Sequence, residues 1–256
     1  KEEKEMKFYK VQASGNDFIV MLEGEAPDKS RRADYAKKLC ERKLSIGADG
    51  FLVLDKKSDN DLHWDFYNSD GSTAEMCGNA SRAVAKLFIE KLGGKSPVNL
   101  TTGGGITEIE VVNQLYSVKM PICQFVAEES QGNVWNTGVP HYVFEKKFDI
   151  KDEAIKEFCR ENRFPNCLND KGANVSLWYK KQDQFFAVSF ERGVEDFTLA
   201  CGTGAAACGL DILKRHSDLG DSIRLQLPGG QVNIRKTNDS VYLIGDAEII
   251  FEGKVD

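Results

Sequence analysis

The sequence predicts a mixed α/β protein, of the α+β type, made of two similar halves. Short runs of alternating apolar and polar residues predict strands, and segments with apolar residues at helical spacing lie between them. Three segments of the first half also resemble three segments of the second half at a nearly constant separation. A repeat of this length is too long for a solenoid, so it favours a duplicated domain with a pseudo-two-fold axis.

In the first half, residues 6–20 predict two strands joined by the turn Ser14-Gly15-Asn16-Asp17. Residues 30–42 predict a helix because their alanines, Leu39 and Cys40 can share one face. A second helix is expected at residues 80–92, where Gly93-Gly94 ends it. Further strands are expected at residues 51–54, 62–67, 98–102 and 106–112.

The second half repeats this plan. Residues 138–143 resemble residues 15–20 at an offset of 123, and residues 225–230 (LQLPGG) resemble residues 100–105 (LTTGGG) at an offset of 125. A strand at 187–190 precedes a loop and a helix that runs from about Gly202 to Arg215. We therefore expect one domain at 1–126, which the last strand at 247–256 can join, and another at 127–246. The polar run 127–131 resembles a linker between them.

The composition limits the classes of partner. A chain of 256 residues has room for two domains, and 41% hydrophobic residues suffice for packed cores. The net charge of -6 argues against nucleic acid or an anionic membrane as the main partner. No apolar run approaches the roughly 20 residues that span a bilayer. The charged start lacks the apolar core of a signal peptide, so we expect a cytoplasmic protein.

Two cysteines stand at equivalent places in the repeat. Cys77 precedes Gly78-Asn79, and Cys201 precedes Gly202-Thr203 at an offset of 124, each just before a predicted helix. The first N–H groups of a helix are unpaired and can hold a carboxylate. They also lower the pKa of a nearby thiol, which favours the reactive thiolate. The two motifs together indicate one site built from two similar halves.

Each of these cysteines, taken alone, is more often a buried structural residue than a catalytic one. Their equivalent placement reverses that interpretation. The chain has seven cysteines in all, with no CxxC pair, and its three histidines form no cluster, so we expect reduced thiols and no metal site. The remaining cysteines lack the helix setting and are interpreted as structural: Cys40, Cys123, Cys159, Cys167 and Cys208.

Other polar residues have both a structural and a functional interpretation. Glu191-Arg192 could be an ordinary solvated pair, but it leads into the second cysteine loop, where the arginine could hold a carboxylate bidentately. His141, which follows Pro140, is in isolation more often structural. The asparagines could be only turn residues: Asn16, Asn68, Asn79 and Asn174.

The motifs together resemble the diaminopimelate epimerase family of cofactor-independent amino-acid racemases and epimerases. The resemblance covers nearly the whole chain and is carried by Gly15-Asn16-Asp17-Phe18, Asn68-Ser69-Asp70-Gly71-Ser72, Cys77-Gly78-Asn79, Glu191-Arg192-Gly193 and residues 198–204, TLACGTG. It implies two α/β domains, each a β-structure wrapped around a central helix, with the active site in the cleft between them.

The resemblance also implies roles for individual residues. Cys77 and Cys201 would be the catalytic thiolate and thiol that interconvert LL- and meso-diaminopimelate, without a cofactor or metal. Arg192, Asn68 and Asn174 would take the distal carboxylate, and Glu191 the distal ammonium. The other positions implied in substrate binding are Asn16, Gly78, Asn79, Gly202 and Thr203, with His141 in a supporting role. The implied partner is a small amino-acid substrate, and a homodimer is the assembly considered.

Three positions depart from the family pattern. Val139 stands where asparagine is usual, and losing a hydrogen bond to a charged group costs roughly 1.5–3 kcal/mol if nothing replaces it. Ala80 replaces a glycine, and Phe197 replaces a common glutamate. Val139 keeps open a racemase of another amino acid, such as histidine. A non-catalytic or phenazine-biosynthesis-like relative is the other alternative, against which the paired cysteines argue.

Overall fold

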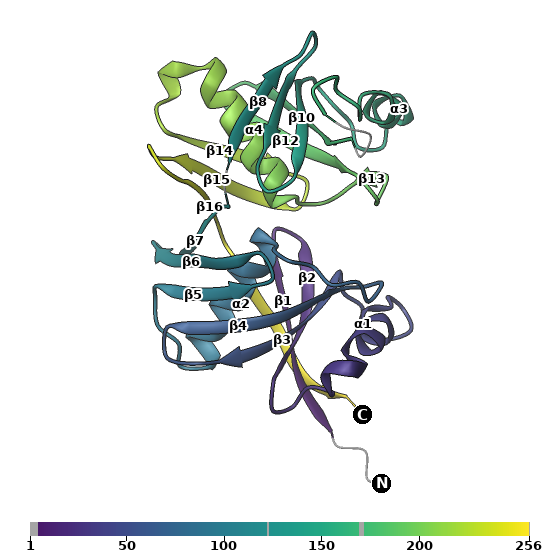
Figure 1. The fold of residues 1–256 in the computed structure, drawn as a ribbon, viewed down its shortest axis with the longest axis vertical. Coiled ribbons are helices and arrows are strands. Elements are labelled where there is room, and N and C mark those ends of the chain that lie inside the picture. The colour runs from purple at the N-terminus through teal and green to yellow at the C-terminus, as the bar shows by residue number, and fades with distance from the viewer. Residues whose placement is uncertain (1–4, 122, 169–171, 256) are drawn as a thin grey trace. The chain divides into compact units, whose positions relative to one another are not determined.

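The computed structural model describes residues 5–121, 123–168 and 172–255, which form two compact units. One unit runs to Val118 and resumes at Asp246, and the other covers Lys119–Gly245. The division at residues 126 and 127 stays a prediction, because dense contacts alone do not show which segments fold independently. Figure 1 shows the elements of each unit.

The first unit surrounds helix α2 (Gly78–Lys91) with strands and carries the shorter helix α1 (Arg32–Cys40) at its edge (Figure 1). A 3-10 turn, η1 (Lys29–Arg31), leads into α1. The strands are β1 (Met6–Ala13), β2 (Asn16–Leu22), β3 (Gly50–Lys56), β4 (Asp61–Asn68), β5 (Val98–Thr102), β6 (Gly105–Val112), β7 (Leu115–Lys119) and β17 (Glu248–Val255).

Strands of the first unit pair in the order β17, β1, β2, β3, β4, β5, β6, β7. All pairs are antiparallel except β2–β3 and β4–β5. These two parallel pairs are the ones joined by a helix, α1 and α2 respectively, because a parallel pair needs a crossover connection. The C-terminal strand β17 therefore lies beside the N-terminal strand β1.

The second unit has helix α4 (Gly202–Arg215) among its strands and helix α3 (Glu153–Glu161) at its edge (Figure 1). A 3-10 turn, η2 (Ser217–Leu219), follows α4. The strands are β8 (Gln124–Glu128), β9 (Asn133–Asn136), β10 (Pro140–Glu145), β11 (Asn174–Lys181), β12 (Gln184–Glu191), β13 (Asp196–Phe197), β14 (Ser222–Leu227), β15 (Gly230–Lys236) and β16 (Val241–Gly245).

The strands of the second unit repeat the pairing scheme of the first. Their order is β8, β9, β10, β11, β12, β14, β15, β16, with β13 as an added antiparallel partner of β12. Again only two of these pairs are parallel, β10–β11 and β12–β14, and α3 and α4 connect them. The predicted α/β fold with two pseudo-symmetric halves is confirmed.

Each central helix is buried by the strands of its own unit. Helix α2 contacts β1, β2, β6 and β17, and helix α4 contacts β9, β10, β11, β12, β14, β15 and β16. Such enclosure requires small side chains along the helix, which explains the buried alanines of both helices: Ala80, Ala83, Ala85, Ala205, Ala206 and Ala207. The arrangement agrees with the expected β-structure wrapped around a central helix.

Some sequence-based bounds are corrected. The helix expected at 30–42 is shorter, and α2 begins at Gly78 instead of residue 80. The polar run 127–131 is not simply a linker, since residues 127 and 128 belong to β8, which pairs with β9. Most side chains of β8 are exposed, and only its last two residues fall within the run that resembles a linker. Among the described residues, no helix has the length and apolar character needed to cross a membrane.

Candidate active site

Cys77 is the residue that begins helix α2. Its backbone is extended (φ -148°, ψ 118°), and its sulfur accepts the Ala80 N–H at 3.5 Å. The next two positions, Gly78 and Asn79, open the helix. A capping thiol therefore lies among the unpaired N–H groups of the first turn, as the sequence predicts.

Cys201 begins helix α4 in the same way. Its backbone is also extended (φ -117°, ψ 111°), and its sulfur accepts the Gly204 N–H at 3.4 Å. Gly202 and Thr203 stand where Gly78 and Asn79 stand in the first unit. The two cysteines thus have equivalent local geometry, each capping the buried helix of its own unit.

In the first unit, side chains from two elements converge on Cys77. The thiol lies 3.7 Å from Asn16 Oδ1, and Asn79 Nδ2 donates to the same oxygen at 3.4 Å. Asn79 Oδ1 accepts from Arg82 Nη2 at 2.7 Å. Arg82 is fully buried, and burial lowers the pKa of its guanidinium to about 10. The predicted residues Cys77, Asn16 and Asn79 are therefore brought together.

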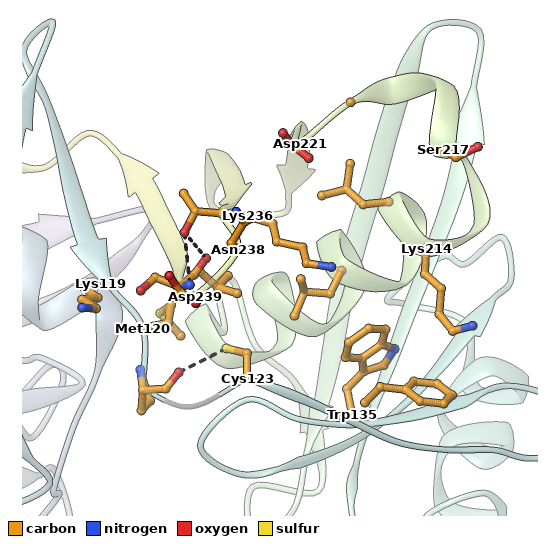
Figure 2. A pocket seen from close by; sticks show the side chains of 18 residues that line it. Lys119, Met120, Cys123, Trp135, Lys214, Ser217, Asp221, Lys236, Asn238 and Asp239 are labelled. Atoms are coloured by element: carbon orange, nitrogen blue, oxygen red, sulfur yellow. Dashed lines mark hydrogen bonds between the residues drawn. The ribbon is translucent and has the colours of Figure 1, made fainter.

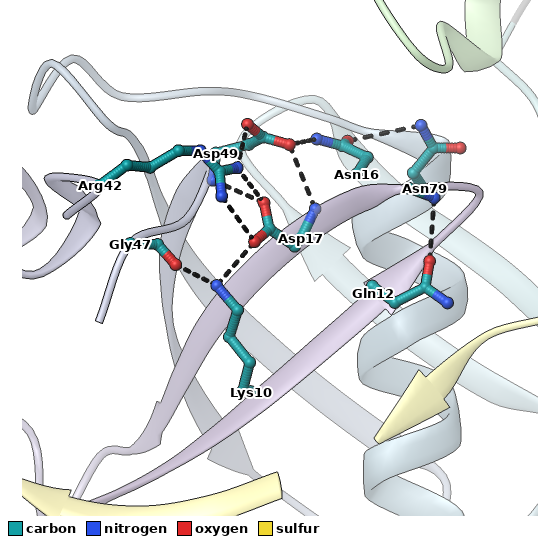
Figure 3. Close-up of polar contacts among 9 residues, drawn as sticks. Lys10, Gln12, Asn16, Asp17, Arg42, Gly47, Asp49 and Asn79 are labelled. Atoms are coloured by element: carbon teal, nitrogen blue, oxygen red, sulfur yellow. Dashed lines mark hydrogen bonds and ion pairs between the residues drawn. The ribbon is translucent and has the colours of Figure 1, made fainter. Parts of the chain in front are cut away.

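A charged cluster lies on the other side of Asn16 (Figure 3). Asn16 Nδ2 donates to Asp49 Oδ2 at 2.7 Å, and Arg42 Nη2 lies 2.9 Å from Asp49 Oδ1. Asp17 contacts both Arg42 and the buried Lys10, whose Nζ is 2.7 Å from Asp17 Oδ2. Burial alone would raise the pKa of Asp17, but hydrogen bonds and charge from Arg42 and Lys10 lower it below the ordinary value.

Asn68 lies at the end of β4 and shapes the following turn. Its Nδ2 donates to Ser72 Oγ at 2.9 Å, and its backbone carbonyl accepts the Gly71 N–H at 2.9 Å. Gly71 has a φ of 82°, which a glycine tolerates best. The turn residues of this motif thus hold Asn68 in place.

In the second unit, Cys201 is linked to a buried histidine. Thr203 Oγ1 lies 3.4 Å from the sulfur and 3.0 Å from His141 Nε2. His141 Nδ1 is 2.8 Å from Ser176 Oγ, which is 2.8 Å from Ser189 Oγ. Burial lowers the pKa of His141 to about 3, so the imidazole is neutral at physiological pH.

The remaining predicted residues of this unit are Asn174, Arg192 and Glu191. They are linked to His141 or to Cys201, Arg192 through Asn174. Asn174 Nδ2 lies 3.4 Å from His141 Nε2, and Asn174 Oδ1 accepts the Arg192 N–H at 2.8 Å. Arg192 Nη1 also donates to the Gly172 carbonyl at 3.2 Å. Burial raises the pKa of Glu191, although hydrogen bonds from Thr198 and Cys201 act in the opposite direction.

Val139 occupies the position where the family pattern has asparagine. It lies in the turn before β10 with 36% of its surface exposed, and its carbonyl accepts the Thr137 N–H at 3.2 Å. Its side chain has no polar atom. The equivalent position in the first unit is Asn16, so the two units differ here in what they can offer a substrate or a thiol.

Several residues of these groups belong to no motif of the sequence. Asp49 and Ser176 are not among the predicted site residues, and Ser189 is predicted only as part of the strand at 187–190. Arg82 had a detectable signal, since it is a charged residue within the Ala-rich sequence of a predicted buried helix. The others lie far from the cysteines in sequence and gave no local signal.

Two cavities of the second unit differ in size and in the residues that line them. A cavity of about 870 Å³ is lined by apolar residues, which include Met120 and Trp135, and by polar residues, which include Lys214, Lys236 and Asp239 (Figure 2). None of the predicted site residues lines it. A cavity of about 10 Å³ lies beside Cys201 and Ser189, which is the size of a single water. The chemistry-bearing groups and the large cavity are therefore in different places.

The other cysteines differ in burial. Cys40, Cys159 and Cys208 are buried in the cores, and burial raises the pKa of Cys40 and of Cys159 to about 12. Cys123 is half-buried. Cys167 is exposed on a surface loop, so it does not pack in a core. Within the described ranges, no group of three or more His, Cys, Asp or Glu side chains could hold a metal.

Comparisons with known proteins agree with the duplicated architecture. The sequence matches the family model described as diaminopimelate epimerase over residues 8–123 and 134–250. A diaminopimelate epimerase of Campylobacter lari is 37% identical over an alignment that covers 98% of this chain and 96% of that protein. One from Hydrogenobaculum sp. is 32% identical over an alignment that covers 95% of this chain and 96% of that protein.

Among solved structures, a phenazine biosynthesis protein of the PhzF family from Enterococcus faecalis has a TM-score of 0.74 at 12% identity, covering 99% of this chain and 100% of that one. At such low identity the likeness shows the fold alone. The fold and the epimerase matches define this protein as an isomerase. The matches over both halves go further: the chain belongs to the diaminopimelate epimerase family.

Proposed function

We propose that this protein interconverts LL- and meso-diaminopimelate by inverting one α-carbon. The observation that carries the proposal is the equivalent placement of Cys77 and Cys201, each capping the buried helix of its unit. Inversion by proton transfer needs a base on one face of the carbon and an acid on the other. Each half of the duplicated chain provides one thiol, so the two halves together supply the base and the acid.

In the proposed reaction, one cysteine acts as a thiolate and removes the α-proton. The other cysteine acts as a thiol and gives its proton to the opposite face of the same carbon. One C–H bond breaks and one C–H bond forms. The cysteine that began as a thiolate ends as a thiol, and the other ends as a thiolate. The reverse reaction therefore exchanges their roles. The proposal includes no cofactor.

Charge stabilisation is the second requirement. Removing an α-proton places negative charge on the substrate, where it can spread onto the α-carboxylate. The N–H groups that open α2 and α4, at Gly78, Asn79, Gly202 and Thr203, are suited to hold such a carboxylate. Preorganised N–H donors of this kind commonly give large rate enhancements, because they need no reorganisation during the reaction.

Recognition of the distal amino-acid group is assigned to Arg192, Glu191, Asn174 and Asn68. Arg192 leaves β12, and Asn174 accepts its backbone N–H, which fixes the start of that loop. The half-buried Glu191 carboxylate would be stabilised by a substrate ammonium, because an opposite charge offsets the cost of burial. A second ammonium and carboxylate are what distinguish diaminopimelate from a simple α-amino acid.

The test is proton exchange with solvent. The reduced protein is incubated with LL-diaminopimelate in D₂O without added cofactor, and stereochemistry and α-deuteration are followed together. We expect meso product with deuterium at the inverted centre. Folded protein that produces neither inversion nor deuteration would refute the assignment.

A second candidate, a racemase of another amino acid, is favoured by one observation. Val139 removes a polar side chain at the position that Asn16 occupies in the first unit. A panel of amino acids that includes histidine, run under the same D₂O conditions, separates the two candidates. Exchange on another amino acid with none on diaminopimelate would favour the second.

A further inference from the structure

A chain of side-chain hydrogen bonds in the first unit runs from one charged group to another. Arg82 donates to Asn79 Oδ1 at 2.7 Å, and Asn79 Nδ2 donates to Asn16 Oδ1 at 3.4 Å. Asn16 Nδ2 then donates to Asp49 Oδ2 at 2.7 Å (Figure 3). The Cys77 sulfur lies 3.7 Å from Asn16 Oδ1, in the middle of this chain. We call Arg82, Asn79, Asn16 and Asp49 the amide relay.

The charged ends of the amide relay fix the direction of both amides. A guanidinium can only donate hydrogen bonds, so Asn79 must turn its oxygen toward Arg82. An ionised carboxylate can only accept, so Asn16 must turn its nitrogen toward Asp49. A flipped Asn16 would place its NH₂ against the NH₂ of Asn79 and its oxygen against the carboxylate. The Asn16 carbonyl oxygen is therefore the atom that faces Cys77.

Both ends of the relay are themselves held in place. Arg82 is buried and also donates to the Asp246 carbonyl at 3.0 Å and to Ser14 Oγ at 3.1 Å. Asp49 pairs with Arg42, and its Oδ2 also accepts the Asp17 N–H at 3.2 Å. The orientation of Asn16 is thus set by anchors from β1–β2, from α2 and from the loop before β3.

We propose that Asp49 and Arg82 are positioning residues that hold the Asn16 carbonyl oxygen against Cys77, so that Cys77 is favoured as a thiol that donates its S–H. A thiolate has no proton to donate, and it would face the lone pairs of that oxygen. The relay therefore opposes ionisation of Cys77 in the substrate-free protein. The consequence for catalysis, that Cys77 starts as the proton donor, rests on the proposed function.

Other groups around Cys77 act in the opposite direction. The N–H groups of α2 and the positive charge of Arg82 favour the thiolate. The flanking charges come from β1 and β2, with Lys10 and Asp17, and from the loop before β3, with Arg42 and Asp49. The oriented Asn16 oxygen is what balances the helix N-terminus, and its effect can be measured separately from these charges.

Among the described residues of the second unit, no asparagine stands at the position of Asn16, so the amide relay is not repeated there. Val139 takes the place of Asn16, and the groups beside Cys201 are the Thr203 hydroxyl and the Glu191 carboxyl. The two thiols therefore have different hydrogen-bond partners although their backbone settings match. Cys201 serves as an internal reference in any measurement on Cys77.

The test follows alkylation of each cysteine by iodoacetamide as a function of pH, in the full-length substrate-free protein, with site-resolved mass spectrometry. In Asp49→Ala, the strong 2.7 Å contact that holds the Asn16 NH₂ is gone, so Asn16 can give up its longer 3.4 Å hydrogen bond from Asn79, turn its NH₂ toward the sulfur and stabilise the thiolate. We expect the midpoint for Cys77 to fall by about one pH unit, since a donor replaces an acceptor. The midpoint for Cys201 should stay unchanged.

A double-mutant cycle separates orientation from charge, because Asp49→Ala also removes a negative charge. If Asp49 acts through the Asn16 amide, its effect on Cys77 disappears in an Asn16→Ala background. An equal shift in both backgrounds would show that charge alone acts, and an unchanged midpoint in Asp49→Ala would show no effect at all. Either result overturns the proposal.

Further controls keep the outcome clear. Arg42→Gln removes the ion pair but leaves the Asp49 oxygen that accepts from Asn16, so the Cys77 midpoint should not fall. Asp49 is exposed on a loop, so its replacement should fold, and Asp49→Ser repeats the cycle if Asp49→Ala does not. Alkylation needs no substrate. A failed D₂O experiment therefore leaves this inference standing, whereas an unshifted midpoint refutes it whatever the activity.

Discussion

Cys77 and Cys201 differ from the other cysteines in their backbone setting. Each caps a helix with an extended backbone and accepts an N–H from the first turn. By contrast, Cys40, Cys159 and Cys208 are buried in cores, where a thiol is inert. The reactivity of a thiol therefore depends on the few backbone groups around its sulfur.

Replacing either capping cysteine tests its role directly. We expect Cys77→Ala and Cys201→Ala each to reduce inversion by a factor of about 10²–10⁴, since each removes a positioned proton-transfer group. The unfolding temperature should change little, because both thiols are only half-buried. Cys167→Ala, which removes an exposed thiol, is the matched control and should retain full activity. Wild-type rates in either capping variant would exclude the two-base assignment.

Glu191 is expected to lower the stability of the folded protein at neutral pH and to be needed for activity. Burial raises its pKa above the unfolded value, so the folded protein bears the cost of a buried charge at neutral pH and not at low pH, where the carboxyl is protonated in both states. Glu191→Gln should therefore raise the unfolding temperature at pH 7. The gain should vanish as the pH falls below the ordinary glutamate value of about 4.3.

The same variant should lose activity, because an amide cannot pair with a substrate ammonium. Thermal unfolding from pH 4 to 8 together with the D₂O assay checks both effects. Glu157→Gln, on the exposed face of α3, removes an equal charge. It should show neither the stability gain at pH 7 nor the loss of activity. A stability gain that persists unchanged at low pH would contradict the burial argument.

The start of helix α4 is packed more tightly than the start of α2. A Cβ added at Gly204 would lie 1.8 Å from Ser189 Oγ and 3.2 Å from His141 Cε1. The equivalent residue in α2 is Ala80, whose Cβ is accommodated in the core. The two capped helices share their geometry but not the space around their first turns.

Gly204→Ala should therefore destabilise the protein by about 1–3 kcal/mol, the usual cost of overpacking. Helix propensity alone predicts the opposite, because alanine is favoured over glycine by about 1 kcal/mol inside a helix. Ala80→Gly is the matched control and should cost about 1 kcal/mol from propensity alone. Urea unfolding measures both, and a more stable Gly204→Ala protein would show that Ser189 and His141 move aside at little cost.

Most helices and strands of the first unit were predicted, whereas helix α3 and several strands of the second unit, among them β9, β11 and β16, were not. Apolar spacing and small residues at the cysteine motifs indicated α2 and α4, and the bounds are off by only one or two residues in most places. The exposed strand β8 was missed because its apolar residues, Phe125, Val126 and Ala127, are consecutive and do not alternate with polar ones. The periodicity of a strand is lost when few of its side chains face a core.

The whole molecule is a duplication, which gives each unit one capping cysteine. If both thiols reach the same α-carbon, as the proposed reaction requires, oxidation should join them in a disulfide. We expect activity to fall during aerobic storage and to return with a thiol reductant, with a Cys77–Cys201 cross-linked peptide detected by mass spectrometry. The exposed Cys167 is a competing site of oxidation. Cys167→Ser should therefore lose activity on storage and regain it with reductant, as the wild-type protein does. Activity that never depends on reductant would remove the support for this prediction.

The sequence by itself determined the duplicated α/β class, the two cysteines and their place at helix starts. These depend on neighbouring residues and on a repeat that can be read along the chain. Only the tertiary structure decided which side chains surround each thiol, such as Arg82 and Asp49 around Asn16 or Ser176 beside His141. Those contacts join segments brought together by parallel crossovers, and a hydrogen bond depends on ångström distances between residues that may be separated by dozens of positions in the chain.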